Sequence, residues 1–448
     1  MVLKSITAWR QQTARQRTDL DQTSFPAVQD SATGGGSPTD GEPDHQQQIQ
    51  QEIQLNASAW DGRINFVTGF FSFWETTDVV RTIAVDAGAI QPTTANDIST
   101  DNFTWAIYGQ GTADVTDWLS LTAGLRYTSD RKSFDQIAFD PTTSAPPGGG
   151  SGEETFTSWT PAATVALLTP DDWLLDTPVE HLMGYFTYSR GFKGGGFNAI
   201  RQPQIASADV VPFQPETLDS FELGAKSIAF DGALTANIAL FYGAYDDIQV
   251  TQFLTEVDPN DPSSIVSQRV TRNAAEATTK GVEFELQARP IDGLIVTGSL
   301  GYVDARYDDF ADAENQLTGA TFNRAGETFP RTPEFNSFLS LQYSLPLEVS
   351  SDSPFNGWLT PRLEWAYRSS YHILAPELVD ATQRGFNLLN VRLSYDFLSD
   401  RAQVALWAKN LLDEAYFSEA IGVVQPFGYV SRFYEAPLTF GGELSYRF

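Results

Sequence analysis

The chain has 448 residues, of which 57 are acidic and 28 are basic, so its formal charge is −29. This acidic balance argues against nucleic-acid binding, which needs a basic footprint. Cysteine is absent, which excludes disulfides, thiol catalysis and cysteine ligands for zinc.

The composition favours a membrane protein built from strands. Aromatic residues make up 13% and charged residues 19% of the chain, whereas soluble proteins carry about 25% charged residues. A soluble chain of this length would usually fold as two or three domains. No apolar run reaches the ~18 residues of a membrane-spanning helix. If the chain spans a membrane, it therefore does so with strands.

The first residues predict a strand and no leader. Residues 2–11 form a predicted strand, and Met1 is followed by neither a long apolar core nor a small-residue cleavage site, so we expect no signal peptide. Alternation of apolar and polar residues resumes at 50–58. Asp61-Gly62 is then a strong signal for a two-residue hairpin turn before the aromatic strand 67–74.

The same unit, a hairpin followed by a polar loop, repeats along the chain. Further short turns are predicted at Asp231-Gly232, Asp292-Gly293 and Ser399-Asp400. Further strands are predicted at 103–111, 119–128, 158–168, 181–190, 217–228, 234–253, 265–289, 294–307, 335–345, 358–370, 386–397, 401–412 and 436–448. Long loops are predicted at 12–46, 76–100, 131–156, 191–214, 308–333, 371–385 and 413–435.

The two faces of a predicted strand differ sharply. In 386–397 one face carries Leu389, Val391, Leu393, Tyr395 and Phe397, and the other carries Asn390, Arg392, Ser394 and Asp396. The charged face cannot be a dry core, because burying unpaired charge is costly. The apolar face must be covered by a second sheet in a soluble sandwich, or by lipid in a barrel with a polar lumen.

Loop lengths favour the barrel. Short turns and long loops alternate along the chain, as in outer-membrane barrels with short periplasmic turns and long external loops. The last strand ends on Phe448, and a terminal aromatic suits a membrane interface, although an edge strand of a soluble sandwich explains that strand alone equally well. We predict an all-β fold, a transmembrane antiparallel up-and-down β-barrel with about 16 strands, an even number.

Six segments, in order along most of the chain, resemble one family, the TonB-dependent outer-membrane receptors for iron complexes. They are Gly124–Thr128 (G-L-R-Y-T), Ser189–Asn198 (S-R-G-F-K-G-G-G-F-N), Phe213–Lys226 with its P-E and E-L-G-A-K, Asn273–Glu283 ending in K-G-V-E, Asn410–Tyr416 (N-L-L-D-E-A-Y) and the terminal Phe448.

The resemblance implies a plugged barrel of about 22 strands in the outer membrane that imports a scarce ligand with energy from the TonB complex. Residues 1–448 would then be a partial barrel that lacks about six strands, the plug domain, the TonB box and the signal peptide. We therefore expect no energised transport from this polypeptide unless a plug is supplied. The implied partners are outer-membrane lipid and a ferric siderophore or a similar nutrient. The family's C-terminal assembly signal maps to Tyr446 and Phe448, although Glu443 stands where the family has glycine.

Ligand contacts are expected in the external loops and the upper lumen. The candidates are Arg190, Phe192, Lys193 and Phe197 in the Gly-rich loop and Tyr371 and His372 in a later loop. Basic and aromatic groups suit an anionic, ring-bearing iron chelate. The alternative interpretation, that they are interface aromatics and loop charges, stays open.

No metal site, cofactor or enzymatic activity is predicted. The three histidines, His45, His181 and His372, are too scattered for a metal pair, and no G-x-S-x-G elbow is present. Three functions remain: a receptor for energised uptake of a ferric siderophore or similar iron complex, a passive porin-like channel, and a soluble β-rich binding protein.

Overall fold

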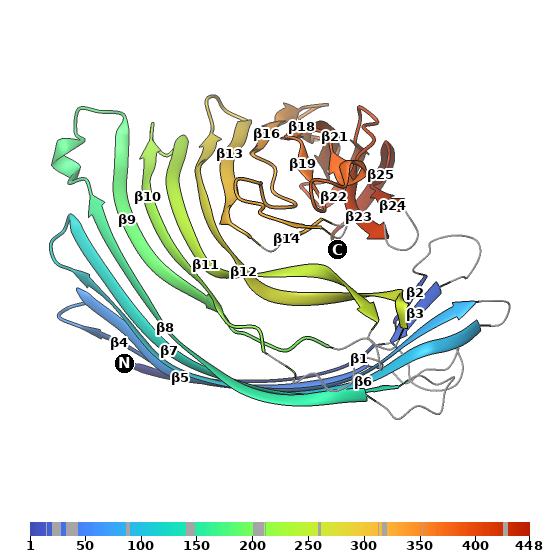
Figure 1. Ribbon diagram of the computed structural model, residues 1–448. Helices are drawn as coiled ribbons and strands as arrows, with labels where there is room; N and C mark the ends of the chain where they lie inside the picture. Colours follow the sequence, from blue (N-terminus) through green and yellow to red (C-terminus); the bar gives the residue numbers. More distant parts are fainter. Residues whose placement is uncertain are drawn as a thin grey trace.

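The computed structural model of the chain is dominated by one curved antiparallel sheet (Figure 1). The main sheet has 19 strands, and three separate two-stranded sheets accompany it. The structure describes residues 1–14, 16–19, 28–32, 44–86, 90–139, 148–199, 210, 212–258, 261–311, 313–315, 320–351, 353–423 and 429–448.

Sixteen strands follow one another around the sheet in chain order, each antiparallel to the next. They are β1 (Val2–Ala14), β4 (Asp44–Ala59), β5 (Ile64–Asp86), β6 (Ile90–Asp114), β7 (Leu119–Phe139), β8 (Gly148–Leu168), β9 (Val179–Lys193), β10 (Glu216–Ala229), β11 (Leu234–Asp258), β12 (Asp261–Ala288), β13 (Leu294–Asp309), β16 (Phe335–Tyr343), β18 (Gly357–Arg368), β21 (Phe386–Phe397), β22 (Ala402–Lys409) and β25 (Thr439–Tyr446). The predicted up-and-down order and strand number are confirmed.

The remaining elements are short. Within the main sheet they are β2 (Gln16–Asp19), β3 (Val28–Ala32) and β17 (Leu345–Leu347). The three small sheets are formed by β14 (Ala313–Glu314) with β15 (Thr321–Phe322), β19 (Tyr371–His372) with β20 (Thr382–Gln383), and β23 (Phe417–Val423) with β24 (Tyr429–Tyr434). Two 3-10 helices, η1 (Asp171–Trp173) and η2 (Val379–Ala381), complete the described elements. No helix in the described part of the chain is long and apolar enough to cross a membrane.

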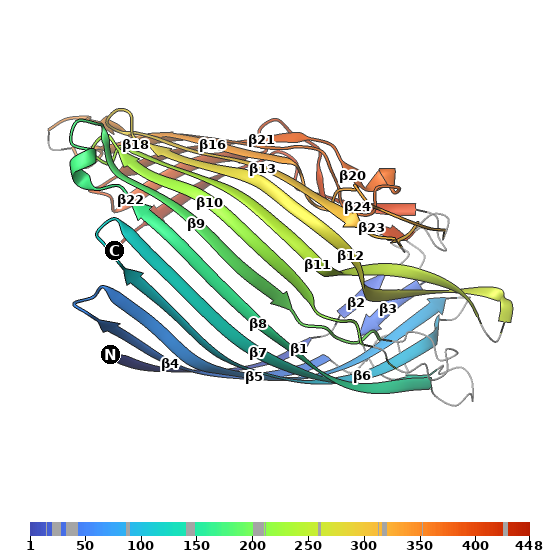
Figure 2. The same ribbon diagram turned by 60° about the vertical axis from the view of Figure 1, so that its left-hand side comes forward.

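The short turns gather at one end of the curved sheet, where both chain termini also lie (Figure 2). The predicted turn residues have the left-handed backbone that such turns require, with φ of 52° at Asp61, 92° at Gly62, 55° at Asp231 and 74° at Gly232. The alternation of short and long connections therefore sorts them to opposite ends, as predicted.

Two of the predicted long loops are wrong. Most of 76–100 belongs to β5 and β6, which pair as far as Asp86 and Ile90, and most of 131–156 belongs to β7 and β8. The hydrogen-bonded ladders continue far beyond the point where the apolar alternation stops. The predicted loop at 12–46 contains β2 and β3 and the ends of β1 and β4, and its other residues lie outside those described.

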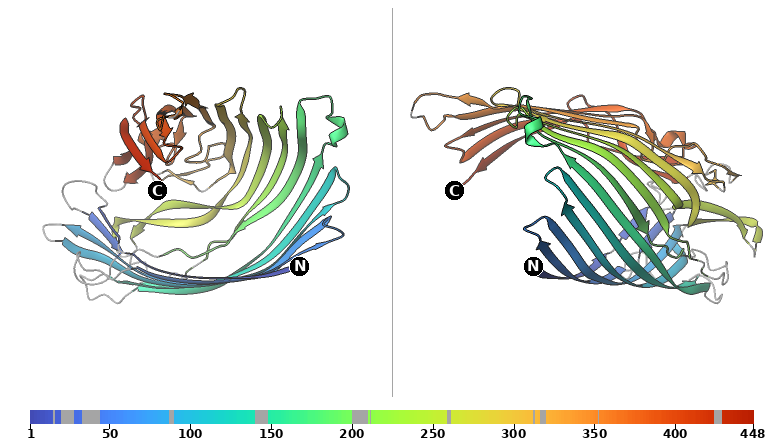
Figure 3. Two further views of the ribbon diagram at one scale, coloured as in Figure 1. Left: turned by 180° about the vertical axis from the view of Figure 1, so that it is seen from behind. Right: turned by 90° about the vertical axis from the view of Figure 1, so that its left-hand side faces the viewer.

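The curved sheet is open in the part of the chain that is described. Strand β1 pairs with β4 and β25 pairs with β22, and no described pairing joins β1 to β25. Figure 3 shows the two edge strands apart, with the N- and C-termini at the same end. The concave side of this sheet is its inner wall, and the convex side is its outer wall.

Candidate functional site: the two walls and the Gly-rich strap

Exposed aromatic side chains form a ring at the short-turn end of the sheet. Trp60, Trp118, Trp173, Phe230 and Phe355 lie in or beside short turns, and the terminal Phe448 lies at the same end. Aromatic girdles of this kind mark the membrane–water interfaces of outer-membrane barrels. We call this set the lower ring.

A second set of aromatic side chains crosses the middle of the outer wall. Rings contact one another in the groups Trp105–Tyr127–Trp159, Tyr188–Phe221–Tyr242 and Tyr302–Phe335, with centroid separations of 4.8–6.4 Å. We call this set the upper ring. Nine residues separate Trp118 from Tyr127, and nine separate Phe221 from Phe230. Nine residues of strand span about 30 Å, and the usual tilt reduces this to about 23 Å, the height of a barrel's apolar band.

Between the two rings the outer wall is apolar and uncovered. Large side chains such as Leu125, Leu223 and Leu406 are 47%, 55% and 60% exposed. In the described strands, the outward positions of this band carry no Lys, Arg, Asp or Glu. A soluble sandwich would cover these side chains with a second sheet, so that interpretation is wrong, and the transmembrane β-barrel fold is confirmed.

The inner wall is polar and laced with hydrogen bonds. The Tyr108 hydroxyl donates to Glu52 Oε1 at 2.6 Å, and Gln54 Nε2 donates to the same oxygen at 3.0 Å. The Arg126 guanidinium lies 5.3 Å from the Phe71 ring centre and 5.8 Å from that of Tyr108. This arrangement leaves a cation held between aromatic faces on the side that lines the lumen.

The Gly-rich segment folds back over the inner wall. From the end of β9, residues 194–199 cross toward β7 and β12, and we call residues 194–199 and 212–215 the strap. Lys132 Nζ donates to the Gly195 carbonyl at 2.6 Å, and Gly196 pairs with Phe213 in a β-bridge. A Cβ on Gly195 would overlap the Phe213 carbonyl, so glycine is required there for close approach. The strap is therefore a docked element rather than a free loop.

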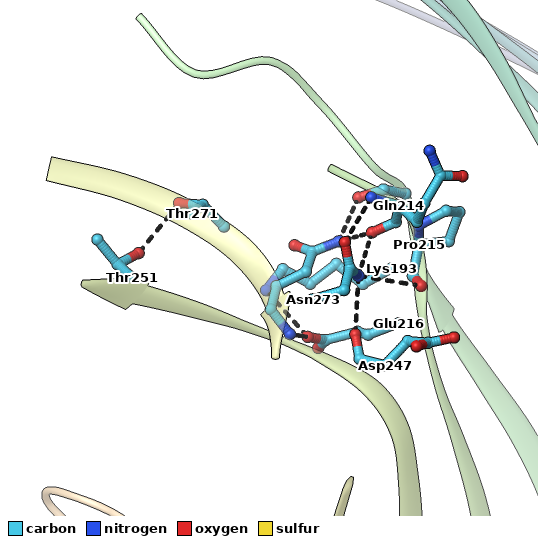
Figure 4. Close-up of polar contacts among 10 residues, drawn as sticks. Lys193, Gln214, Pro215, Glu216, Asp247, Thr251, Thr271 and Asn273 are labelled. Carbon is cyan, nitrogen blue, oxygen red and sulfur yellow. Dashed lines mark hydrogen bonds and ion pairs between the residues drawn. The ribbon is translucent and has the colours of Figure 1, made fainter. Parts of the chain in front are cut away.

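Asn273 fastens the far end of the strap (Figure 4). Its Oδ1 accepts the Gln214 N–H at 2.5 Å, and its Nδ2 donates to the carbonyls of Gln214 at 2.6 Å and Asp247 at 2.9 Å. Asp247 has φ of 56° at a shift of register between β11 and β12. The amide of Asn273 thus joins the strap to an irregular point of the wall.

Gln249 and Glu216 complete this clamp. Gln249 Nε2 donates to the carbonyls of Gly194 at 2.9 Å and Gln214 at 3.0 Å, and Glu216 Oε2 accepts the Gln249 N–H at 2.7 Å. Glu216 also pairs with Lys193 at 3.6 Å. Neither Gln249 nor the docking of the strap was predicted, because the Gln249 contacts join residues 33 to 55 positions apart.

The six candidate ligand residues do not form one group. Strand register places Arg190 and Phe192 on the outer wall, just beyond Tyr188 in the upper ring. Arg190 makes a two-point ion pair with Asp219, and the Tyr188 hydroxyl donates to the same carboxylate at 2.8 Å. Their ligand-binding role stays a prediction.

Lys193 and Phe197 lie on the inner side. The Lys193 side chain is 60% exposed beside Glu216, and the Phe197 ring stacks on Phe134, with centroids 5.8 Å apart and planes inclined by 23°. Phe134 is itself buried. Of the two, Lys193 is the side chain more accessible from the lumen.

Tyr371 and His372 belong to a separate assembly of loops. Both lie in β19, where His372 Nδ1 is 2.9 Å from Thr382 Oγ1, and Tyr371 packs on a cluster that includes Ile373 and Phe417. No described contact joins them to the Gly-rich strap. They too stay predicted ligand residues.

Three long connections form this loop assembly, namely 310–334, 369–385 and 410–438. Each pair of connections is joined by an arginine–carboxylate bridge: Arg324–Glu377, Arg331–Glu419 and Arg432–Asp380. Burial lowers the pKa of Arg324, but its hydrogen bonds to Glu377 and Glu327 raise the pKa by more than burial lowers it. The pKa of Arg324 therefore lies above its ordinary value. The guanidinium therefore stays charged inside the assembly.

The residues of the predicted assembly signal end the last strand. Tyr446 is half-exposed in β25 opposite Ala402, and its ring meets that of the fully exposed Phe448 edge-on at 5.2 Å. Both lie at the level of the lower ring. Their role in assembly stays a prediction.

The chain matches known proteins over most of its length. The family model described as TonB dependent receptor-like, beta-barrel, matches residues 3–411. The ferric-pyoverdine BN7/BN8 receptor of Pseudomonas putida is 22% identical over 325 residues, which cover 72% of this chain and 32% of that receptor.

Solved structures share the fold. The ferric yersiniabactin uptake receptor FyuA of Yersinia pestis superposes with a TM-score of 0.76 at 18% identity, over 100% of this chain and 58% of FyuA. The siderophore receptor PiuA of Acinetobacter baumannii superposes with a TM-score of 0.69 at 13% identity, over 99% of this chain and 62% of PiuA. This chain thus spans less than two thirds of the length of each of these relatives.

The comparisons agree with the walls described above. Six motif segments, an apolar outer band and a polar inner wall all belong to one kind of barrel. The matched family consists of receptors and transporters rather than enzymes, in line with the predicted absence of enzymatic activity. The chain belongs to the TonB-dependent receptor-like β-barrel family.

Proposed function

We propose that this chain forms the membrane wall of an outer-membrane receptor that takes up a ferric siderophore or a similar iron complex with energy from TonB. The observation that carries the proposal is the uncovered apolar band between two aromatic rings, backed by a polar inner wall. Relatives named as receptors for ferric pyoverdine and ferric yersiniabactin support the class of ligand.

The inner wall offers cations for an anionic chelate. Lys193 is exposed at the strap, and Arg126 lies between two aromatic rings with no carboxylate bridge among the described residues. Charge-assisted hydrogen bonds and stacking would hold an anionic, ring-bearing ligand at such groups. Tyr371 and His372 would meet the same ligand from the loop assembly, while Arg190 and Phe192 could meet it only beyond the membrane edge.

Growth under iron limitation tests this function. Residues 1–448 are expressed with and without a supplied plug domain in a strain stripped of its own siderophore receptors, and growth is measured on ferric pyoverdine and ferric yersiniabactin. With the plug supplied, the proposal expects growth on at least one chelate, loss of that growth without TonB, and weaker growth for Arg126→Gln and Lys193→Gln than for the control Arg63→Gln at an exposed turn. Without the plug it expects no growth.

A passive channel would behave differently in the same strains. Entry of small polar solutes would rise with expression of the protein, would persist without TonB and would ignore both inner-wall substitutions. Such a result would replace the receptor proposal with the porin-like alternative. Failure of the protein to enter the outer-membrane fraction would overturn both.

A further inference from the structure

The outer wall of the last strands contains an apolar groove. It measures about 640 Å³ and crosses β16, β18, β21 and β22. Two rows of outward side chains form it. One row contains Leu341, Leu363, Val391 and Ala408, and the next contains Pro361, Leu393 and Leu406.

Small and cyclic side chains explain the hollow. Pro361 stands in the middle of β18, where its short ring replaces a long apolar side chain and its missing N–H cannot bond to a neighbouring strand. Ala408 in the first row and Gly442, opposite Leu406 in the second, are also small. Longer leucine side chains surround these small residues, so the outer surface is hollow at this place.

The groove lies within the apolar band. Phe355 of the lower ring precedes Pro361 by six residues, and Trp365, half-buried on the outer wall, follows it by four. The polar side chains of the same strands point the other way. Arg362 and Arg392, which also border the groove, line with Gln403 a second cavity of about 1050 Å³ on the inner wall. The outer groove therefore offers a ligand almost nothing but hydrocarbon.

We propose that this groove is a seat for one acyl chain of a membrane lipid, held longer than the lipids around the rest of the wall. The proposal rests on the membrane location given under the proposed function. The groove is continuous with the lipid-facing band, so hydrocarbon chains are what meets it. Within a bilayer, groups associate through van der Waals packing rather than through the hydrophobic effect. A flexible acyl chain can fill the groove and make the van der Waals contacts that an empty groove would lack.

Photolabelling from the lipid tests the seat. The protein is placed in bilayers of phosphatidylethanolamine and phosphatidylglycerol that contain a phosphatidylethanolamine with a diazirine on its acyl chain, and labelled peptides are identified after irradiation. We expect peptides that cover 341–343, 361–363 and 404–408 to be labelled several-fold more than the reference band at 119–127. Equal labelling of groove and reference would overturn the proposal.

Matched variants test whether the extra labelling depends on the groove rather than on the apolar band as a whole. Ala408→Leu fills the groove and should lower groove labelling to the reference level, whereas Ala163→Leu, at an outward alanine of β8, should leave it unchanged. If Ala408→Leu fails to fold, Leu406→Ala, which widens the groove, should shift labelling toward Pro361. Labelling of neither groove nor reference would refute the membrane location itself. Groove labelling below the reference, with dimers by size in the same bilayers, would overturn the lipid seat and assign the groove to a second copy of the chain.

Discussion

Arg324 and Glu377 meet head to head inside the loop assembly, with Nη1 donating to Oε2 at 3.0 Å and Nη2 to Oε1 at 2.7 Å. The two side chains are only 8% and 12% exposed. One belongs to the connection after β13 and the other to the connection after β18. A buried, two-point bridge therefore ties two loops that are more than 50 residues apart.

Removing one partner of this bridge should be costly. Arg324→Met removes the two-point partner of the buried Glu377 carboxylate, and breaking a buried pair in this way destabilises by about 3–5 kcal/mol. Hydrogen exchange should rise across both connections, at 320–329 and 371–383. The double variant Arg324→Met/Glu377→Met should recover much of the loss. Arg63→Met, which removes the exposed bridge to Asp117, should change stability by less than about 1 kcal/mol, and an equal effect of both single variants would contradict the account.

The loop assembly should respond as one unit. Phe417 and Ala420 of the third connection pack on Ile373, Leu378 and Ala381 of the second. Hydrogen exchange in Arg324→Met should therefore also rise at 417–423, although Arg324 has no described bridge to that segment. Exchange confined to the first connection would show that the loops open independently.

Asn273 should control docking of the strap. Asn273→Leu removes one hydrogen bond from the Gln214 N–H and three to carbonyls, and a typical hydrogen bond contributes about 0.5–1.5 kcal/mol. Proteolysis within the strap should accelerate accordingly. Thr251→Val, which removes only an exposed contact to Thr271 nearby (Figure 4), is the matched control. The account fails if the two variants are cleaved at the same rate.

Glycine at 195 should be irreplaceable where a glycine facing lipid is not. Gly195→Ala forces the new methyl against the Phe213 carbonyl and the Phe156 ring, so the strap must move. Gly184→Ala adds a methyl that finds only the Gly224 carbonyl, 4.0 Å away. Thermal unfolding in detergent should shift clearly downward for the first and little for the second. Equal shifts would mean that the strap does not dock as described.

Adjacent residues of β7 should differ in their tolerance of charge. Ala123 faces outward midway between Trp118 and Tyr127, and Thr122 faces inward beside Thr112. Ala123→Arg should destabilise the folded barrel in lipid by about 2–4 kcal/mol, because the charge meets the bilayer centre. Thr122→Arg should cost much less. If Thr122→Arg were the more destabilising of the two, the inner and outer walls would have to be exchanged.

The sequence predicted the elements that face lipid better than those that do not. Strand β21 has the predicted bounds, 386–397, because its outward side chains must be apolar and its inward ones polar. Beyond the upper ring both faces of a strand meet water, so the alternation disappears while the backbone ladder continues. That is why 76–86 and 131–139 were predicted as loops although they extend β5 and β7.

The candidate site was only partly predictable. The motif residues around Lys193 and Phe197 were found from the sequence, but their directions were not, because wall assignment at 190–193 depends on register with β10. Side chains that fasten backbone, such as Asn273 on Gln214, leave no periodic signal. The same holds for Arg324 and Glu377, whose meeting depends on how two long connections fold.

Strands β5 and β7 each continue twelve residues past Trp74 and Tyr127, about 40 Å of hydrogen-bonded backbone. A molecule that approaches the long-loop end on this side meets paired strands rather than irregular loops. Paired strands lose little conformational entropy when a ligand binds, so a small contact area is enough to hold a ligand there. In the described part of the chain, the connections after β13, β18 and β22 contain only short strands. We expect them to form the more flexible side of the entrance.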